Sequence, residues 1–211
     1  KRLVNSINDN VKVIYPTTNS GYGIGEKNKF CTEETPLKPI SLYGKTKTDA
    51  EKIIMLRKNS ISFRLATVFG YSYRMRTDLL VNFMTKEAVD KKKLTIFEPY
   101  FRRNFVHIND VVDAFIFALK NFQSLRGNVY NLGLSSANIT KIELAKSIKK
   151  VVKNLNIKID KNGFDPDKRD YIVSNDKIEK KGFKASTDLD TGIRELVEVF
   201  GISNSKYINN Y

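Results

Sequence analysis

The chain has 211 residues, of which 41% are hydrophobic and 28% charged, and its formal net charge is +14. This composition is typical of a soluble globular protein of about one to one and a half domains. There is no apolar run long enough for a membrane-spanning helix, and the single Cys31 and single His107 exclude an internal disulfide and a Cys/His metal cluster. We therefore expect a cytoplasmic protein without a metal site.

The positive charge raises the question of nucleic-acid binding, which uses lysine and arginine to contact phosphates. The lysine runs at residues 91–93, 149–150 and 180–181 lie at predicted helix ends or turns, where the helix dipole favours cations. No aromatic residues alternate with them in a nucleic-acid-binding motif. We expect no nucleic-acid partner, although a basic nucleic-acid-binding module remains an alternative class. A basic surface can also attract an anionic substrate.

The first structural signal is a strand followed by a polar loop. Residues 1–7 are expected to be helical, residues 11–15 form a β-branched run, and residues 17–25 are rich in hydroxyls and glycine. Open α/β sheets place their sites in loops at the carboxyl ends of parallel strands. A proline-containing connection at 32–39 then leads to Tyr43.

Tyr43 and Lys47 are four residues apart at the start of a predicted helix, so both side chains lie on the same face. A nearby ammonium favours the charged form of a phenol. A tyrosine in that setting can exchange a proton with a hydroxyl or carbonyl near neutral pH. Because the spacing alone is common, its surroundings decide whether the pair is catalytic.

Beyond Tyr43, strands and helices alternate, which predicts an α/β fold. Thr140 and Glu143 form a capping box at a helix start, and Asn109 is the predicted N-cap of a buried helix. The expected helices cover about residues 43–57, 79–89, 109–119, 140–155, 175–181 and 188–200, and the expected strands cover 60–67, 94–97, 104–107 and 128–132.

Several short motifs follow one another in a recognisable order. They are T-T-N-S-G-Y-G at 17–23, Y-x-x-x-K at 43–47, F-R-L-A-T-V-F-G at 63–70, L-T-I-F at 94–97, R-N-F-V-H-I-N-D-V at 103–111, N-V-Y-N-L-G at 128–133, D-K-R-D-Y at 167–171 and K-I-E-K-K-G-F at 177–183. In this order they resemble the motifs of the extended short-chain dehydrogenases/reductases, the family that contains nucleotide-sugar epimerases and dehydratases.

The resemblance implies a partial Rossmann-like sheet, doubly wound and mainly parallel, with a small α-rich C-terminal substrate domain. Residues 1–135 match the C-terminal half of an NAD-binding domain, with substrate-domain insertions near 71–104, and residues 136–211 match the substrate domain. The family's G-x-x-G-x-x-G turn, which holds the dinucleotide at a helix N-terminus, does not occur here. We therefore expect the C-terminal part of a longer protein, homodimeric when complete and inactive as this piece alone.

The resemblance also implies roles at the reacting carbon. Tyr43 is the expected acid/base that exchanges a proton with a sugar hydroxyl, Lys47 supports Tyr43 and contacts the nicotinamide ribose, and Thr18 holds the same sugar oxygen. These three residues and Ala66 are the expected contacts of the cofactor, which is NAD or alternatively NADP. A turn-forming hydroxyl is the alternative role for Thr18.

A nucleotide-sugar substrate is implied as well. Arg103 and Arg169 are expected at its pyrophosphate, since a guanidinium suits phosphate oxygens. Arg102 is the alternative to Arg103, and a surface ion pair is the alternative role for Arg169. The other expected substrate contacts are Thr67, Asp78, Leu79, Asn82, Thr95, Ile96 and Phe97. His107 and Asp110 are expected to be structural.

Two departures from the family motifs narrow the reaction. Asn19 and Ser20 occupy the positions of an Asp–Glu pair that the related 4,6-dehydratases use for water elimination, so dehydration is disfavoured. Thr67 stands where many epimerases have Asn. We therefore expect an NAD-dependent 4-epimerase of a nucleotide sugar. A keto-sugar reductase that uses NAD(P)H is the alternative, followed by a 4,6-dehydratase and a non-catalytic family member.

Overall fold

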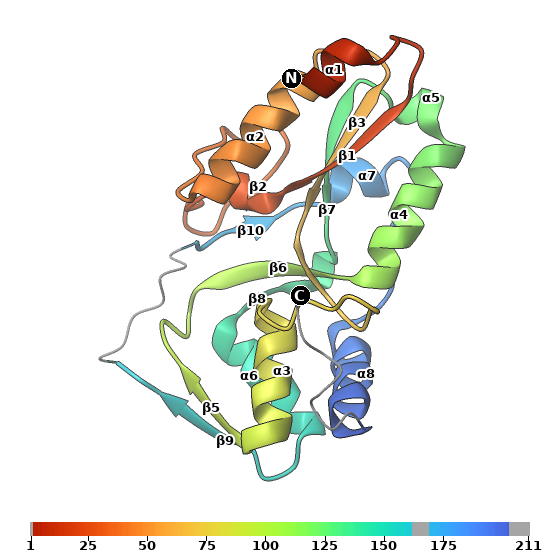
Figure 1. The fold of residues 1–211 in the computed structure, drawn as a ribbon. Helices are drawn as coiled ribbons and strands as arrows, with labels where there is room; N and C mark the ends of the chain where they lie inside the picture. The colour runs from red at the N-terminus through yellow and green to blue at the C-terminus, as the bar shows by residue number, and fades with distance from the viewer. Residues whose placement is uncertain (1, 162–168, 203–211) are drawn as a thin grey trace.

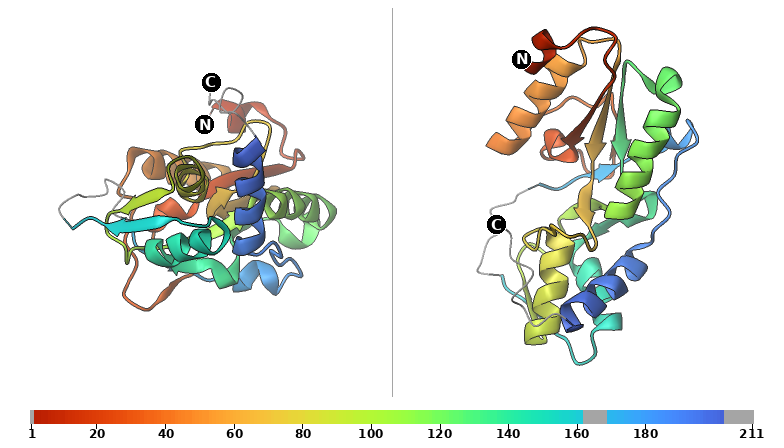
Figure 2. Two further views of the ribbon diagram at one scale, coloured as in Figure 1. Left: turned by 90° about the horizontal axis from the view of Figure 1, so that it is seen from below. Right: turned by 45° about the vertical axis from the view of Figure 1, so that its right-hand side comes forward.

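The computed structural model describes residues 2–161 and 169–202, whose helices and strands lie in two parts (Figure 1). The upper part in Figure 1 is a parallel sheet with helices on both faces, and the lower part contains short strands and three longer helices. Strands β3 (Ser60–Leu65) and β4 (Thr67–Phe69) follow each other directly and run from the upper part into the lower one, as the right-hand view of Figure 2 shows.

The upper sheet has β3 at its centre, with β1 (Val13–Thr18) and β7 (Asn128–Leu132) on either side, and all three strands are parallel. Nearly every residue of β3 is buried, as expected for a strand covered on both faces. The helices around this sheet are α1 (Arg2–Ser6), α2 (Leu42–Ile54), α4 (Ile108–Lys120) and α5 (Phe122–Leu125).

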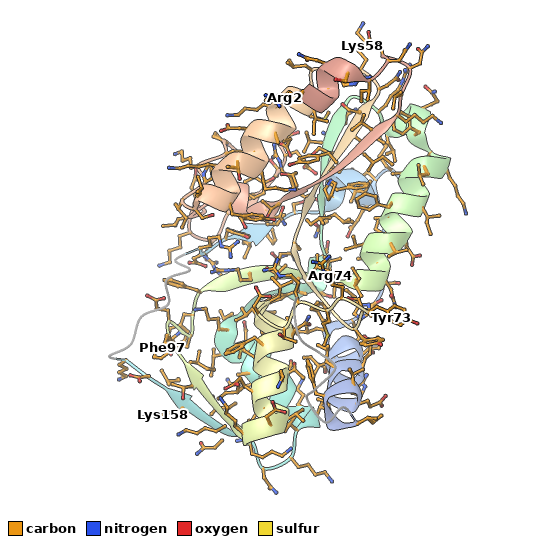
Figure 3. All side chains as sticks on the ribbon, viewed as in Figure 1. Arg2, Lys58, Tyr73, Arg74, Phe97 and Lys158 are labelled. Atoms are coloured by element: carbon orange, nitrogen blue, oxygen red, sulfur yellow. The ribbon has the colours of Figure 1, made fainter. Side chains whose placement is uncertain are left out.

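The direction of these strands decides where a site can lie. Lys58, just before β3, lies at the end of the upper part that is remote from the lower part (Figure 3). The carboxyl ends of β1 and β3 therefore point toward the lower part. Ligand sites of open α/β sheets lie at such carboxyl ends.

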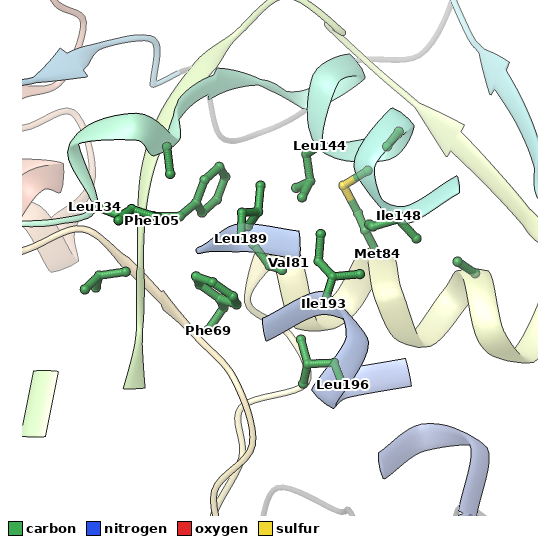
Figure 4. Close-up of a cluster of buried hydrophobic side chains, with 14 of the residues drawn as sticks. Phe69, Val81, Met84, Phe105, Leu134, Leu144, Ile148, Leu189, Ile193 and Leu196 are labelled. Carbon is green, nitrogen blue, oxygen red and sulfur yellow. The ribbon is translucent and has the colours of Figure 1, made fainter. Parts of the chain in front are cut away.

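The lower part is built on a second hydrophobic core, shown in Figure 4. Its strands are β4, β6 (Arg102–His107) and β8 (Asn138–Thr140) in one sheet, and β5 (Lys93–Ile96) and β9 (Asn156–Ile159) in another. Its helices are α3 (Leu80–Lys91), α6 (Lys141–Val151) and α8 (Leu189–Ile202). Each helix turns an apolar face into the core, so that Val81, Leu144 and Ile193 are fully buried.

A small third hydrophobic cluster lies beside the upper sheet. Strands β2 (Phe30–Cys31) and β10 (Ile172–Val173) pair in parallel, and Tyr22 and Tyr171 pack with them. The 3-10 turns η1 (Asn19–Tyr22) and η2 (Ser135–Ala137) and the short helix α7 (Asp176–Glu179) complete the described elements. The chain thus returns to the upper part after residue 169, and the proposed division at residue 135 stays a prediction.

The α/β class and the mainly parallel sheet are confirmed, and so is the capping box of Thr140 and Glu143. The predicted N-cap Asn109 is wrong. The N-cap is His107, whose ring nitrogen accepts the Asn109 N–H, because the helix begins directly where β6 ends. The helix predicted to reach about residue 155 ends at Val151, since residues 156–159 pair with β5 instead.

Within the described ranges, no helix combines the length and the apolar character needed to span a bilayer. Asp167 and Lys168, part of the predicted D-K-R-D-Y motif, lie outside the described residues.

Candidate functional site

A cavity of about 1400 Å³ lies where the carboxyl ends of β1 and β3 meet the lower part of the molecule. Its wall contains most of the residues that the sequence predicts for a site: Thr18, Tyr43, Ala66, Thr67, Asp78, Leu79, Thr95, Ile96, Phe97, Arg103 and Arg169. Two predicted residues, Lys47 and Asn82, are not part of this wall. The fold thus gathers segments far apart in sequence around one space.

Thr18 ends β1 and caps the 3-10 turn that follows. Its hydroxyl accepts the Ser20 N–H at 3.1 Å and donates to the Ser20 hydroxyl at 3.0 Å. The Arg169 guanidinium donates to that same Ser20 hydroxyl. Ser20 therefore connects the predicted catalytic threonine to the predicted substrate arginine, a link that the sequence did not reveal.

Tyr43 lies in the first turn of α2. The Ser41 side chain caps this helix by accepting the Gly44 N–H at 3.0 Å, which fixes where the turn begins. A Cβ at Gly44 would come within 3.3 Å of the Ser20 carbonyl oxygen, so the helix start packs closely on the loop after Thr18. Tyr43 and Thr18 consequently reach the same cavity, and the Tyr43 side chain is 57% exposed.

Lys47 follows one turn later, but its ammonium turns toward β1. Its Nζ donates to the Pro16 carbonyl at 2.5 Å and lies 4.4 Å from the centroid of the Tyr15 ring. A proline residue has no N–H to donate and is tolerated mainly on edge strands. Among the described strands β1 lies at one edge of its sheet, so Lys47 packs against that edge, and its predicted role beside the cofactor stays a prediction.

Asp78 and Leu79 lie in the loop before α3, on the cavity wall. The Arg76 guanidinium pairs with Asp78, with 2.9 Å between Nε and Oδ1. The hydrogen bond from Arg76 holds the pKa of the Asp78 carboxyl below its ordinary value. Arg76 also lines the cavity, although the sequence prediction did not include it.

Asn82, a predicted substrate contact, lies behind the cavity wall and not on it. The side chain is 2% exposed; its oxygen accepts the Gly70 N–H at 3.1 Å and its nitrogen donates to the Arg76 carbonyl at 3.0 Å. Both groups of the amide hold the loop of residues 70–76 in place. The side chain therefore contacts this loop, and a substrate in the cavity would meet the loop residues first.

The two adjacent arginines of β6 have different surroundings. Arg103 is 3% exposed, lines the cavity and lies 5.8 Å from the centroid of the Tyr171 ring. Arg102 forms an ion pair with Asp170 at 3.2 Å and is not part of the wall. The alternation of side chains along a strand explains why neighbours differ, and the placement favours Arg103 over Arg102.

Lys141 also lines the cavity and is 4% exposed, and the sequence prediction missed it. A signal was present, because position 141 falls on the apolar stripe of Leu144, Ala145 and Ile148 at helical spacing. A lysine at such a position faces the interior and not the solvent.

His107 and Asp110 lie outside the cavity wall. The His107 Nε2 is 2.6 Å from a Glu195 carboxylate oxygen, and Asp110 accepts the Ser186 N–H at 2.9 Å. Both residues join α4 to the segment around α8, as expected of structural residues. Among residues 2–161 and 169–202, no group of three or more His, Cys, Asp or Glu side chains is placed to hold a metal ion.

Comparison with known proteins identifies the family of this chain. Residues 1–133 match the model of the NAD dependent epimerase/dehydratase family. The chain is 28% identical to UDP-glucuronate 4-epimerase 4 of Arabidopsis thaliana, covering 92% of this chain and 49% of that protein. It is 30% identical to UDP-glucose 4-epimerase of Lactobacillus helveticus, covering 71% of this chain and 52% of the relative. The chain thus spans about half the length of these relatives.

Solved structures show the same fold. The dTDP-glucose 4,6-dehydratase of Bacillus anthracis in complex with NAD superposes with a TM-score of 0.80 at 24% identity, over 95% of this chain and 64% of that one. UDP-glucuronic acid 4-epimerase of Bacillus cereus, in complex with UDP-glucuronic acid and NAD, gives a TM-score of 0.76 at 22% identity, over 92% of this chain and 63% of that one.

Proposed function

Because the chain belongs to the NAD-dependent epimerase/dehydratase family, we propose that it provides the catalytic and substrate-binding part of a nucleotide-sugar 4-epimerase. The observation that carries this proposal is the shared cavity. Tyr43 and Thr18, the proposed acid/base and its partner, line the same space as Arg103 and Arg169. A nucleotide sugar needs both kinds of group, one at the reacting carbon and one at the diphosphate.

In this proposal Tyr43 accepts the proton of the sugar C4 hydroxyl as C4 loses hydride, and it returns the proton as C4 regains hydride on its opposite face. Thr18 holds the same oxygen by a hydrogen bond, which orients the sugar. Ser20 fixes the Thr18 hydroxyl, and Arg103 and Arg169 bind the diphosphate oxygens. When bound, NAD supplies the acceptor and donor of the C4 hydride.

The residues near Tyr43 are suited to a nicotinamide. Thr17 lines the cavity, and its hydroxyl is buried without a hydrogen-bond partner among the described residues. A buried polar group of this kind is costly unless a ligand or water satisfies it. Thr17 and Thr18, together with Ala66, would hold the nicotinamide end of NAD. The sequence has no glycine-rich turn for the pyrophosphate, so we expect NAD to bind tightly only to the longer protein.

Epimerisation is favoured over dehydration by the residues after Thr18. Asn19 is 1% exposed, and the Ser20 hydroxyl contacts both Thr18 and Arg169. Neither side chain titrates near neutral pH, so neither can supply the acid and base of a water elimination. Epimerases and dehydratases share this fold. Epimerisation is therefore favoured by the side chains of Asn19 and Ser20 and not by the fold.

The test gives UDP-glucuronate or UDP-glucose to the full-length protein with NAD and follows the C4 epimers by NMR. We expect interconversion without net consumption of NAD. Stoichiometric oxidation of NADPH with a keto-sugar would favour the reductase, and a 4-keto-6-deoxy product would establish a dehydratase. A cytoplasmic location and a homodimer of the full-length protein are also part of this proposal.

A further inference from the structure

Lys141 is a buried cation at the wall of the cavity. The residue is 4% exposed and belongs to the residues that line the cavity. It is the first residue of α6, directly after the N-cap Thr140. Its burial follows from its place on the apolar face of that helix.

The turn at residues 97–101 fixes where the Lys141 ammonium lies. Its Nζ donates to the Phe97 carbonyl at 3.1 Å and is 5.5 Å from the centroid of the Phe101 ring. The backbone N–H of Lys141 donates to the Phe101 carbonyl at 3.2 Å. The ammonium is thus held at the end of β5, where Thr95, Ile96 and Phe97 form part of the wall.

Lys141 lies close to Arg103 because of the strand pairing. Strands β6 and β8 are antiparallel, with Arg102 opposite Thr140 and Arg103 opposite Ile139. Lys141 comes directly after β8, so two cations that are 3% and 4% exposed lie on neighbouring segments of one wall. Away from water, the attraction between such charges and an anion is stronger than at the surface.

We propose that Lys141 is a substrate-binding residue that contacts the diphosphate of the nucleotide sugar together with Arg103 and Arg169. The inference rests on the proposed function and extends it to a residue outside the sequence motifs. The ammonium acts as a compact point charge and the guanidinium groups as planar forks, so the three together can surround a group that carries several oxygens.

The experiment measures binding of UDP, uridine and inorganic pyrophosphate to the full 211-residue chain by calorimetry and NMR. The test variant is Lys141→Met, which keeps an unbranched apolar side chain one atom shorter than lysine and removes the charge. Lys146→Met, an exposed lysine of the same helix, is the matched control. Lys141→Arg restores the charge.

We expect Lys141→Met to weaken the binding of UDP by about ten-fold or more and to leave the binding of uridine unchanged. Lys146→Met should bind both as the parent chain does. Lys141→Arg should recover part of the loss. Equal UDP affinity of Lys141→Met and the parent overturns the proposal. An equal loss for UDP and uridine, with a lower melting temperature, assigns Lys141 a structural role and also overturns it.

The measurement with pyrophosphate distinguishes a failure of the Lys141 inference from a failure of the proposed function. Pyrophosphate binding that depends on Lys141, in a chain that does not bind UDP, supports the anion site and contradicts the nucleotide-sugar substrate. A chain that binds neither UDP nor pyrophosphate contradicts both. UDP binding that is independent of Lys141 leaves the proposed function intact and removes only this residue from it.

Discussion

Glu51 and Arg64 form an ion pair inside the protein, with 2.7 Å between Oε1 and Nη2 and side chains that are 4% and 8% exposed. Glu51 lies on α2, two helical turns after Tyr43, and Arg64 lies on β3. The Ser62 hydroxyl donates to the same carboxylate at 2.9 Å. The pair therefore fastens the helix of the proposed acid/base to the central strand.

The pair continues into a larger buried network. The second guanidinium nitrogen of Arg64 donates to the Tyr22 hydroxyl at 3.1 Å, and that hydroxyl donates to the Asn131 side chain at 2.6 Å. Burial raises the pKa of the Tyr22 phenol, so Tyr22 stays neutral and can donate. The Asn131 amide reaches the Ser174 carbonyl at 3.0 Å. The network thus links α2, β3 and β7 to the segment that begins with Arg169.

Removing one member of the pair should be strongly destabilising. Glu51→Gln leaves the Arg64 charge buried without its carboxylate, which costs about 3–5 kcal/mol of the free energy of unfolding. Urea denaturation of the full chain measures this change. The control is Asp49→Asn, which breaks an exposed pair with Lys52 on the same helix and should cost about 0–1 kcal/mol. Equal stability of the two variants would contradict the structural role of Glu51.

Tyr43→Phe should abolish turnover without changing substrate affinity. The phenol oxygen is the proposed proton acceptor, and loss of a positioned acid/base lowers kcat by about 10²–10⁴-fold. The measurement is epimerase activity of the full-length protein together with the Kd for UDP. Tyr73→Phe, at a fully exposed position (Figure 3), is the control. A Tyr43→Phe enzyme with most of its activity would remove the proton-transfer role.

Asn82→Ala should lower stability and leave ligand binding unchanged. The substitution removes two hydrogen bonds and leaves the buried Gly70 N–H without an acceptor, a loss of about 1–3 kcal/mol. Arg103→Met should instead weaken the binding of UDP and leave stability unchanged. Thermal unfolding and UDP titration of both variants separate the two roles. A direct contact of Asn82 with substrate would instead give a large loss of UDP affinity at unchanged stability.

The capping box of α6 should make stability depend on pH. Hydrogen bonds from the Thr140 side chain and backbone hold the pKa of Glu143 below its ordinary value of 4.5. A lowered carboxylate pKa adds stability above the unfolded-state value, and this stability is lost as the pH falls through the folded-state value. Thr140→Ala should therefore cost about 0.5–2 kcal/mol at pH 7 and less at pH 3. A cost that is the same at both pH values would contradict this coupling.

Local sequence determined much of the secondary structure. The strand of residues 128–132 and the Thr140–Glu143 capping box depend on neighbours within a few positions, so their residue types were sufficient to predict them. The order of short motifs also identified the family, because each motif lies on one continuous segment of chain. The same locality placed Tyr43 and Lys47 on one helical face.

Only the tertiary structure decided which groups the side chains contact. The Lys47 ammonium reaches a carbonyl on β1, and the Asn82 amide holds a loop, because each partner comes from another segment. Strand β9 exists through its pairing with β5, and the burial of Lys141 depends on the packing of α6 against α3 and α8. The sequence alone determined which groups are present and on which elements. The long-range contacts of the fold decided which of them share the cavity, because burial and direction of a side chain depend on residues distant in the chain.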